Sequence, residues 1–209
     1  MNSEVNLPKH IENAIYNYIP TMEGWATPER CCEMAGRILE SRAGLCVDIG
    51  VFAGRSTIAM GFAAREIGAS RVYGLDPWKI ETAIEGDNIE ENARWWKESS
   101  NLEKMHQETM HAIWAHRLDE WVTIIRNGSQ YVSDLFPVID FINIDGCHTE
   151  LASCRDVNLY LPRLRGGGYL TFDDADWETT QPALRLIEAQ CDLIKVMKDK
   201  NEARTYRKR

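Results

Sequence analysis

The sequence predicts one α/β domain with a doubly wound, mostly parallel sheet of seven strands that is closed by a C-terminal antiparallel hairpin. Short apolar segments alternate with helical segments through most of the chain, which is typical of parallel strands joined by crossovers. The last two apolar segments are joined by only a few polar residues, and so short a connection joins antiparallel strands. With 209 residues and 44% hydrophobic content, residues 1–209 are expected to form a single domain.

Two helices are expected in the N-terminal residues 1–44, before the first strand. Residues 9–20 have the pattern of a short amphipathic helix. A second helix is predicted for residues 28–41, because Thr27 suits the N-cap and a proline suits the first helical position. Between the two helices, Trp25 is expected to be a packing residue rather than a ligand contact.

The segment LCVDIGVFAGRSTI, residues 45–58, is the centre of the predicted fold. It joins an apolar strand, a glycine-bearing turn and the start of a helix. Glycines let a backbone approach a ligand, and a helix N-terminus presents unpaired N–H groups, so a cofactor site is expected here. Phe52 stands where a middle glycine would, so the turn does not match the dinucleotide fingerprint. The residues expected at this cofactor site are Asp48, Gly50, Phe52, Gly54 and Ser56.

A second strand is predicted for residues 71–75 and ends in the sequence DPW. A carboxylate at the end of this strand can accept hydrogen bonds from both hydroxyls of a ribose. We therefore expect Asp76 to bind the ribose of a cofactor. Trp78, two residues further on, is expected to cover the adenine ring.

Residues 79–118 make a connection longer than one crossover helix requires. They are polar, helical in pattern and rich in Trp, Met and His. Surplus residues between these strands tend to lie over the carboxyl ends of the sheet, so we expect a helical cap that faces the substrate. Packing onto the body is the simpler explanation for each of Trp95, Trp96 and Trp114 alone. The three histidines of this segment recur at intervals of five, which does not keep one helical face, so no metal site is expected there.

The third strand, residues 121–125, is followed by Asn-Gly-Ser. Gly128 and Ser129 are suited to close approach by an adenine ring. Residues 131–136 are then expected to form one short helix.

Two further strands, 141–144 and 169–172, end in acidic residues. Three consecutive glycines before the second strand are expected to break the preceding helix. Because parallel strands end at one edge of a sheet, Asp145, Asp173 and Asp174 should gather there, where uncompensated carboxylates would repel one another. A divalent cation removes that repulsion, and oxygen ligands favour a hard ion, so the sequence predicts Mg²⁺. The alternative to a metal site is that one aspartate caps the next helix and another faces water.

His148 lies three residues after Asp145, close enough in sequence to reach the same acidic pocket. Histidine is the commonest general base near neutral pH, so His148 is a candidate base, with Asp145 as a second catalytic residue. A hydrogen-bonded structural role for His148 is about equally compatible with the pattern.

The C-terminal residues distinguish two kinds of α/β fold. Strands are predicted for residues 193–197 and 203–206, with a polar turn at 198–201 between them. A mostly parallel sheet closed by such a hairpin is typical of class I methyltransferases. A nicotinamide-binding sheet would continue with a crossover instead.

Four segments resemble the Rossmann-like class I S-adenosylmethionine-dependent methyltransferases, namely VDIGVFAGRST, YGLDPW, EGDNIEENARWW and FINIDGCHTELASCRDVNLYLPRLRGGGYLTFDDADW. The resemblance is to the branch with the macrocin and mycinamicin sugar O-methyltransferases and the aminocoumarin O-methyltransferases, and it extends from about Gly24 to the terminal hairpin. The chain is shorter than the antibiotic-sugar enzymes and lacks their long N-terminal region, so their sugar substrate and oligomeric arrangement are not carried over.

The resemblance also implies roles for individual residues. It places Asp48, Gly50 and Gly54 on the methionine side of the cofactor, Asp76 at the ribose and Ser129 near the adenine. It implies a divalent metal at the carboxylates that follow the fourth and fifth strands, with His148 as the base.

The sequence therefore predicts an enzyme that transfers a methyl group from S-adenosylmethionine to a hydroxyl oxygen of a small molecule with the help of Mg²⁺. A metal-independent methyltransferase, or a cofactor-binding protein without catalysis, remains an alternative. A further alternative is an NAD-dependent oxidoreductase, which Phe52 and the hairpin disfavour.

The charge distribution limits the expected partners. The net charge is −8, and a basic tract occurs only at residues 204–209, so nucleic acid is not an expected partner. The N-terminal residues lack a secretory pattern, and no apolar run approaches the roughly 18 residues of a membrane span. We expect a cytoplasmic protein that acts on a small molecule without a membrane partner, and self-association into a homo-oligomer is left open.

Overall fold

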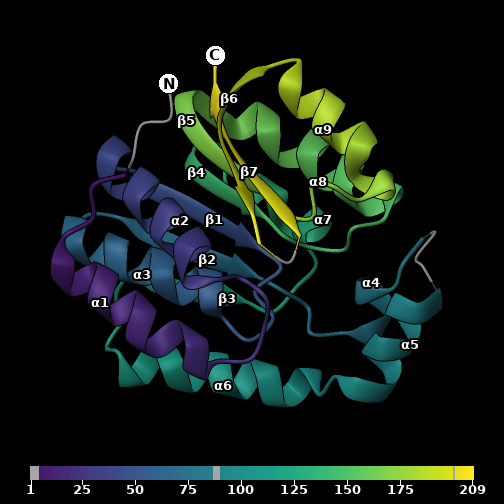
Figure 1. The fold of residues 1–209 in the computed structure, drawn as a ribbon, viewed down its shortest axis with the longest axis horizontal. Coiled ribbons are helices and arrows are strands. Elements are labelled where there is room, and N and C mark those ends of the chain that lie inside the picture. Colours follow the sequence, from purple (N-terminus) through teal and green to yellow (C-terminus); the bar gives the residue numbers. More distant parts are fainter. Residues whose placement is uncertain (1–4, 87–89, 200) are drawn as a thin grey trace.

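A central sheet with helices on both faces organises the computed structural model, which describes residues 5–86, 90–199 and 201–209 (Figure 1). The strands are β1 Leu45–Ile49, β2 Arg71–Leu75, β3 Val122–Ile125, β4 Ile139–Ile144, β5 Leu164–Phe172, β6 Cys191–Lys198 and β7 Glu202–Lys208. The α-helices are α1 Lys9–Tyr18, α2 Pro28–Ser41, α3 Arg55–Ile67, α4 Ile80–Ala83, α5 Glu90–Ser99, α6 Leu102–Ala115, α7 Ser129–Val132, α8 Glu150–Tyr160 and α9 Gln181–Glu188. Short 3₁₀ turns are η1 Ile19–Thr21, η2 Ser133–Leu135, η3 Leu161–Arg163 and η4 Glu178–Thr180.

The strand order confirms the predicted fold class. The sheet runs β3-β2-β1-β4-β5-β7-β6, and its first five strands are parallel. β7 lies between β5 and β6 and is antiparallel to both, which gives the predicted C-terminal hairpin. The carboxyl ends of β1, β2, β4 and β5 consequently meet at one edge of the sheet, where an open α/β fold binds its ligands.

Successive residues of the central strands face two separate cores. Cys46 and Phe141 belong to the core under α1, α2, α3 and α6, whereas Val47 and Ile142 belong to the core under α8 and α9. Because both faces are covered, these strands are mostly apolar and do not alternate regularly with polar residues. Among the described residues, no helix is both long and apolar enough to cross a bilayer.

The prediction that the glycine triplet breaks a helix before strand 169–172 is wrong. β5 begins at Leu164 and contains all three glycines. A Cβ on Gly168 would lie 2.8 Å from the carbonyl oxygen of Asp140, next to a register shift in the β4–β5 pairing. Glycine inside a strand marks such a close backbone approach. The predicted helix at 131–136 is also different, because α7 starts at Ser129 and η2 replaces its second half.

The predicted cap, residues 79–118, divides into two parts. α6 carries Ala112 and Ile113 into the same core as α1 to α3, so it is the crossover helix between β2 and β3. α4 and α5 are the surplus, and they lie beyond the end of the sheet (Figure 1). Residues 87–89 of the predicted cap, and residue 200 of the predicted hairpin turn, lie outside the described residues.

Candidate functional site

A cavity of about 640 Å³ opens at the carboxyl ends of the parallel strands. Its volume lies within the range of about 300–1,000 Å³ typical of small-molecule sites. The loops after β1, β2, β3, β4 and β5 form its floor, and α4, α5 and the turn before α2 contribute its outer wall. Of the residues predicted for the site, those that line this cavity are Gly50, Phe52, Ser56, Asp76, Gly128, Ser129, Asp145, His148, Asp173 and Asp174.

The turn after β1 requires glycine at position 50. Gly50 has φ +88°, and a Cβ there would lie 1.9 Å from the carbonyl oxygen of Asp145. The amide of Gly50 donates to the carbonyl of Leu75, and the amide of Asp145 donates to that of Ile49. The absence of a side chain therefore brings the ends of three strands together around the floor of the cavity.

Backbone amides fix the orientation of the Asp76 carboxylate. The backbone amides of Phe52 and Trp78 donate to its two oxygens over 2.9 and 2.7 Å. Burial raises the pKa of Asp76 to about 6, although these amide hydrogen bonds oppose the shift. The carboxylate faces the cavity with its geometry fixed by the main chain.

Three of the predicted cofactor residues lie behind the cavity wall instead of lining it. Asp48 is fully buried and accepts hydrogen bonds from Ser56 Oγ at 2.7 Å and Asn143 Nδ2 at 2.8 Å, so it fixes the start of α3. Gly54 is the N-cap residue of α3 and faces Thr109.

Trp78, predicted to cover the adenine, packs with Val51, Ala53 and Met105 in a small buried cluster and does not line the cavity. Its indole N–H donates to the carbonyl of Phe52 over 2.8 Å. The tryptophan therefore supports the β1 turn from beneath, a role that proximity to Asp76 in the sequence does not reveal.

The loop after β3 is held by a residue of α8 that was not predicted from the sequence. Ser129 Oγ donates to Asp156 of α8 over 2.6 Å, and the hydroxyl of Tyr160 donates to the carbonyl of Ser129 over 2.7 Å. Burial raises the pKa of Asp156 to about 6. Both Ser129 and Asp156 line the cavity, so the predicted adenine-side loop is anchored by an acid from the next helix.

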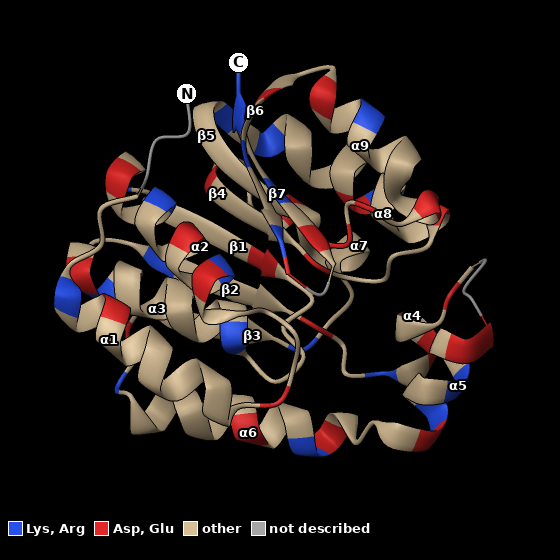
Figure 2. Cartoon of the chain, viewed as in Figure 1, with Lys and Arg blue, Asp and Glu red and all other residues tan. Residues whose placement is uncertain are grey.

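The structure brings the predicted acidic residues together with His148. Figure 2 shows acidic residues where the central strands end. His148 Nε2 lies 3.0 Å from Asp174 Oδ2 and 3.6 Å from Asp145 Oδ1. Burial would lower the pKa of His148, but its hydrogen bond to Asp174 and the charges of Asp174 and Asp173 raise it overall. Burial, together with the nearby charges of Asp173 and Asp174, raises the pKa of Asp145 well above its usual value.

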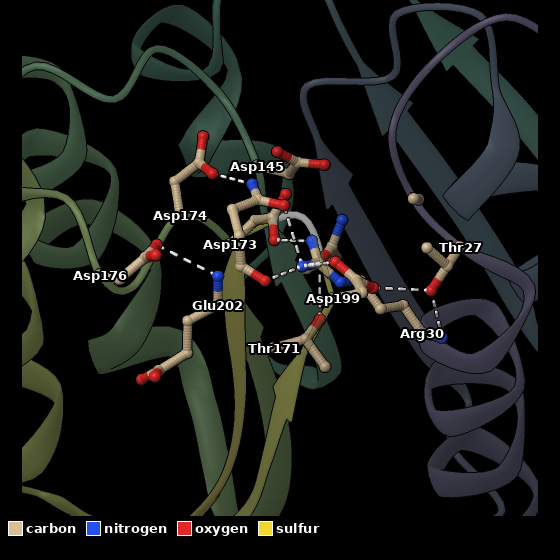
Figure 3. A network of polar contacts seen from close by, with 12 residues as sticks. Thr27, Arg30, Asp145, Thr171, Asp173, Asp174, Asp176, Asp199 and Glu202 are labelled. Atoms are coloured by element: carbon tan, nitrogen blue, oxygen red, sulfur yellow. Dashed lines mark hydrogen bonds and ion pairs between the residues drawn. The ribbon is translucent and has the colours of Figure 1, made fainter.

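These carboxylates are already paired with groups of the protein (Figure 3). The guanidinium of Arg30, from the first turn of α2, donates to Asp173 Oδ1. Asn201 Nδ2 donates to Asp174 Oδ1, and His148 holds Oδ2 of the same residue. Three of the four carboxylate oxygens of Asp173 and Asp174 are thus engaged.

This donor set does not fit the predicted magnesium site. A hard cation needs unengaged carboxylate oxygens turned toward one point, and a guanidinium beside Asp173 adds positive charge where the ion would lie. Within the described ranges, no group of three or more His, Cys, Asp or Glu side chains is arranged to hold a metal.

An aromatic cluster forms the outer wall of the cavity. Trp25 lies 5.1 Å from both Phe52 and Trp95 between ring centroids, and Trp96 lies 5.7 Å from Phe52. Trp25 packs against these rings, and it is also 43% exposed and lines the cavity. An ion pair between Arg155 of α8 and Glu85, which follows α4, also ties this wall to the body.

The sheet order and a cavity at the carboxyl edge define an α/β domain of the methyltransferase type. Residues 47–175 match a family described as a methyltransferase domain, and the chain belongs to this family. The match confirms the methyltransferase prediction made from the sequence motifs. No curated protein matches the chain.

Solved methyltransferase structures share the fold at low sequence identity. An O-methyltransferase from Bacillus cereus in complex with SAH is 15% identical with a TM-score of 0.65, and the match covers 98% of this chain and 94% of that one. TomG from Streptomyces achromogenes, an O-methyltransferase of tomaymycin synthesis in complex with SAM, is 10% identical with a TM-score of 0.65 over 98% and 91%. The O-methyltransferase NovP is 17% identical with a TM-score of 0.64 over 86% and 78%.

Proposed function

We propose that this protein transfers the methyl group of S-adenosylmethionine to a hydroxyl oxygen of a small molecule. The observation that carries the proposal is one cavity lined both by Asp76, the predicted ribose ligand, and by the His148–Asp174 pair. Membership of the methyltransferase family and the cofactors named for the similar structures support it. A cavity of this volume favours a small acceptor over a macromolecule.

The cofactor supplies an activated methyl group, so the protein's task is to position the acceptor oxygen and remove its proton. In the proposed reaction the oxygen attacks the methyl carbon, the carbon–sulfur bond breaks and S-adenosylhomocysteine leaves. His148 Nε2 donates to Asp174, which leaves Nδ1 as the acceptor of the imidazole ring. The paired carboxylate stabilises the imidazolium that forms when the ring takes the hydroxyl proton. No step requires the predicted Mg²⁺, whose carboxylate ligands have other partners.

The first test of the proposal is binding of the product cofactor. We expect S-adenosylhomocysteine to quench the tryptophan fluorescence of the purified protein saturably, because Trp25 and Trp95 border the cavity. Asp76→Asn should weaken this binding at least about tenfold, as loss of one charge-assisted hydrogen bond does. NADH is the control ligand. Saturable binding of NADH without S-adenosylhomocysteine binding would favour the oxidoreductase alternative.

The second test is methyl transfer itself. The protein would be incubated with S-adenosylmethionine and a panel of hydroxyl-bearing small molecules, with S-adenosylhomocysteine formation followed by mass spectrometry. His148→Gln should lower turnover about 10²–10⁴-fold and leave S-adenosylhomocysteine affinity unchanged, as expected for loss of a general base. Unchanged turnover in this variant would remove His148 from the mechanism.

A further inference from the structure

We propose that Arg30 takes the place of a divalent metal ion in the acidic pocket, so that the site is metal-independent and Arg30 is a positioning residue for Asp173, Asp174 and His148. The meaning of this inference for catalysis rests on the proposed methyl transfer. Its central claim, that a guanidinium occupies the position of the ion, is tested separately from the reaction.

The Arg30 guanidinium is held from two sides, by the cavity residue Asp173 and by the terminal hairpin. Its side chain is 4% exposed, and its Nη1 donates to Asp173, the residue that follows β5. Its Nη2 donates to Asp199 Oδ1 at 2.6 Å and to the carbonyl of Asn201 at 2.5 Å, both in the turn between β6 and β7. One guanidinium therefore joins α2, the end of β5 and the terminal hairpin (Figure 3).

The hairpin turn extends this network to the proposed base. The carbonyl oxygen of Asn201 and its side-chain oxygen both accept hydrogen bonds from Arg30, the second over 3.0 Å. The side-chain nitrogen of Asn201 donates to Asp174. Asp174 in turn holds His148. Arg30 is thus connected to the imidazole through two hydrogen-bonded residues and does not need to touch the acceptor.

The backbone also fixes the position of Arg30. Thr27 is the N-cap residue of α2, and its hydroxyl donates to Asp199 Oδ2 over 2.9 Å. The amide of Arg30 donates to Thr27 Oγ1 over 3.4 Å. A basic residue in the first turn of a helix opposes the helix dipole, so its presence here requires a compensating group. The cavity carboxylate of Asp173 provides that compensation.

Charge balance explains why a cation is needed at this point. Asp145, Asp173 and Asp174 converge, and burial raises the pKa of Asp145 and of Asp173. The charges of Asp173 and Asp174 add to the shift at Asp145, and the charge of Asp174 adds to the shift at Asp173. A metal ion and a buried guanidinium both offset such a cluster, but an arginine offers directed donors and cannot exchange with solvent. Because Arg30 already holds Asp173, a divalent ion would have to displace a buried ion pair to bind.

Removing the guanidinium should therefore create a metal site. The test is a titration of the metal-stripped protein with Mn²⁺, followed by electron paramagnetic resonance. The wild type should show no saturable site, whereas Arg30→Ala should bind one Mn²⁺ at least tenfold more tightly than any wild-type association. The double variant R30A/D173N should lose this site, and Arg30→Lys, which keeps the charge, should not acquire it.

Each outcome decides the inference. A wild-type Mn²⁺ site that Asp173→Asn abolishes would overturn it, and this arm holds even if the alanine variant does not fold. A folded Arg30→Ala variant that binds no more Mn²⁺ than the wild type would also overturn it. No cofactor is present in these Mn²⁺ titrations. If S-adenosylhomocysteine failed to bind, the proposed function would be rejected, but the conclusion about Arg30 and the metal would not change.

Discussion

Two arginines of α2, Arg30 and Arg37, are both almost fully buried, yet their partners differ. Arg37 pairs with Glu33 one turn earlier on the same helix over 2.7 Å, and Lys195 of β6 reaches the same carboxylate over 2.9 Å. The side chain of Arg30 instead extends away from α2 and pairs with Asp173, which lines the cavity.

This difference separates a structural ion pair from one that belongs to the site. Glu33 is completely buried, so the charges of the Arg37 pair are compensated within the core. Asp173 borders the cavity, so the charge of Arg30 influences the chemistry of that space. Burial alone does not distinguish the two arginines, but the location of the partner carboxylate does.

The largest effect is expected for Arg37→Met. Removing one member of a buried ion pair leaves the other charge uncompensated, so the free energy of unfolding should fall by about 3–5 kcal/mol. Urea denaturation measures this change. S-adenosylhomocysteine affinity, measured at a temperature where the variant is folded, should stay the same. A loss of cofactor affinity would show that the structural pair also shapes the cavity.

A smaller loss of stability is expected for Arg30→Met. Its partners Asp173 and Asp199 retain 12% and 28% side-chain exposure, so water can solvate them after the change. The free energy of unfolding should fall by about 1–3 kcal/mol, the cost of an unsatisfied polar group. The same urea series provides the comparison, and a loss equal to that of Arg37→Met would remove the distinction between the two arginines.

The raised pKa of Asp76 predicts a pH dependence of S-adenosylhomocysteine affinity. Its pKa is raised to about 6, so it is ionised above that pH and protonated below it. Cofactor hydroxyls donate to the ionised form, so S-adenosylhomocysteine affinity should be full at pH 7 and about tenfold weaker at pH 5.

Two variants assign this pH dependence, because the pKa of Asp156 is also raised to about 6. Asp76→Asn should remove most of the change in affinity between pH 7 and pH 5, and Asp156→Asn should preserve it. The reverse pattern would assign the titration to the loop that Asp156 anchors.

The smallest effect is expected for Glu40→Gln. Glu40 is the second partner of Arg37 at 2.8 Å, but its side chain is 49% exposed. An exposed ion pair contributes less than about 1 kcal/mol, so urea denaturation should barely detect its loss. A larger change would mean that Glu40, rather than Glu33, compensates the buried arginine.

The fold was largely predictable because its signals are local. Apolar strands, the N-cap of α2 and the short terminal connection each identify an element from a few adjacent residues. The conformation of the glycine triplet was predicted wrongly, because it depends on a close contact between β4 and β5, two strands whose contacting residues are far apart in sequence. The surplus in the β2–β3 connection was recognisable, but only packing shows that α6 is the crossover helix.

The site was predictable where strand ends determine it and less so elsewhere. The gathering of Asp145, Asp173 and Asp174 follows from parallel topology. Arg30 was missed because its partner lies 143 residues away. A signal did exist, since Arg30, Met34 and Ile38 follow one another at helical spacing, which places a charge on the buried face of α2. A buried charge in that position requires a partner.

Calorimetric titration of the metal-stripped protein with S-adenosylhomocysteine, first in EDTA and then in millimolar Mg²⁺, tests both the cavity and the role of Arg30. We expect one-to-one binding with the same affinity and enthalpy in both conditions, because Arg30 already supplies the cation beside Asp173. Binding that strengthens or appears only with Mg²⁺ would contradict the role of Arg30. Absence of binding in both conditions would contradict the assignment of the cavity to this cofactor.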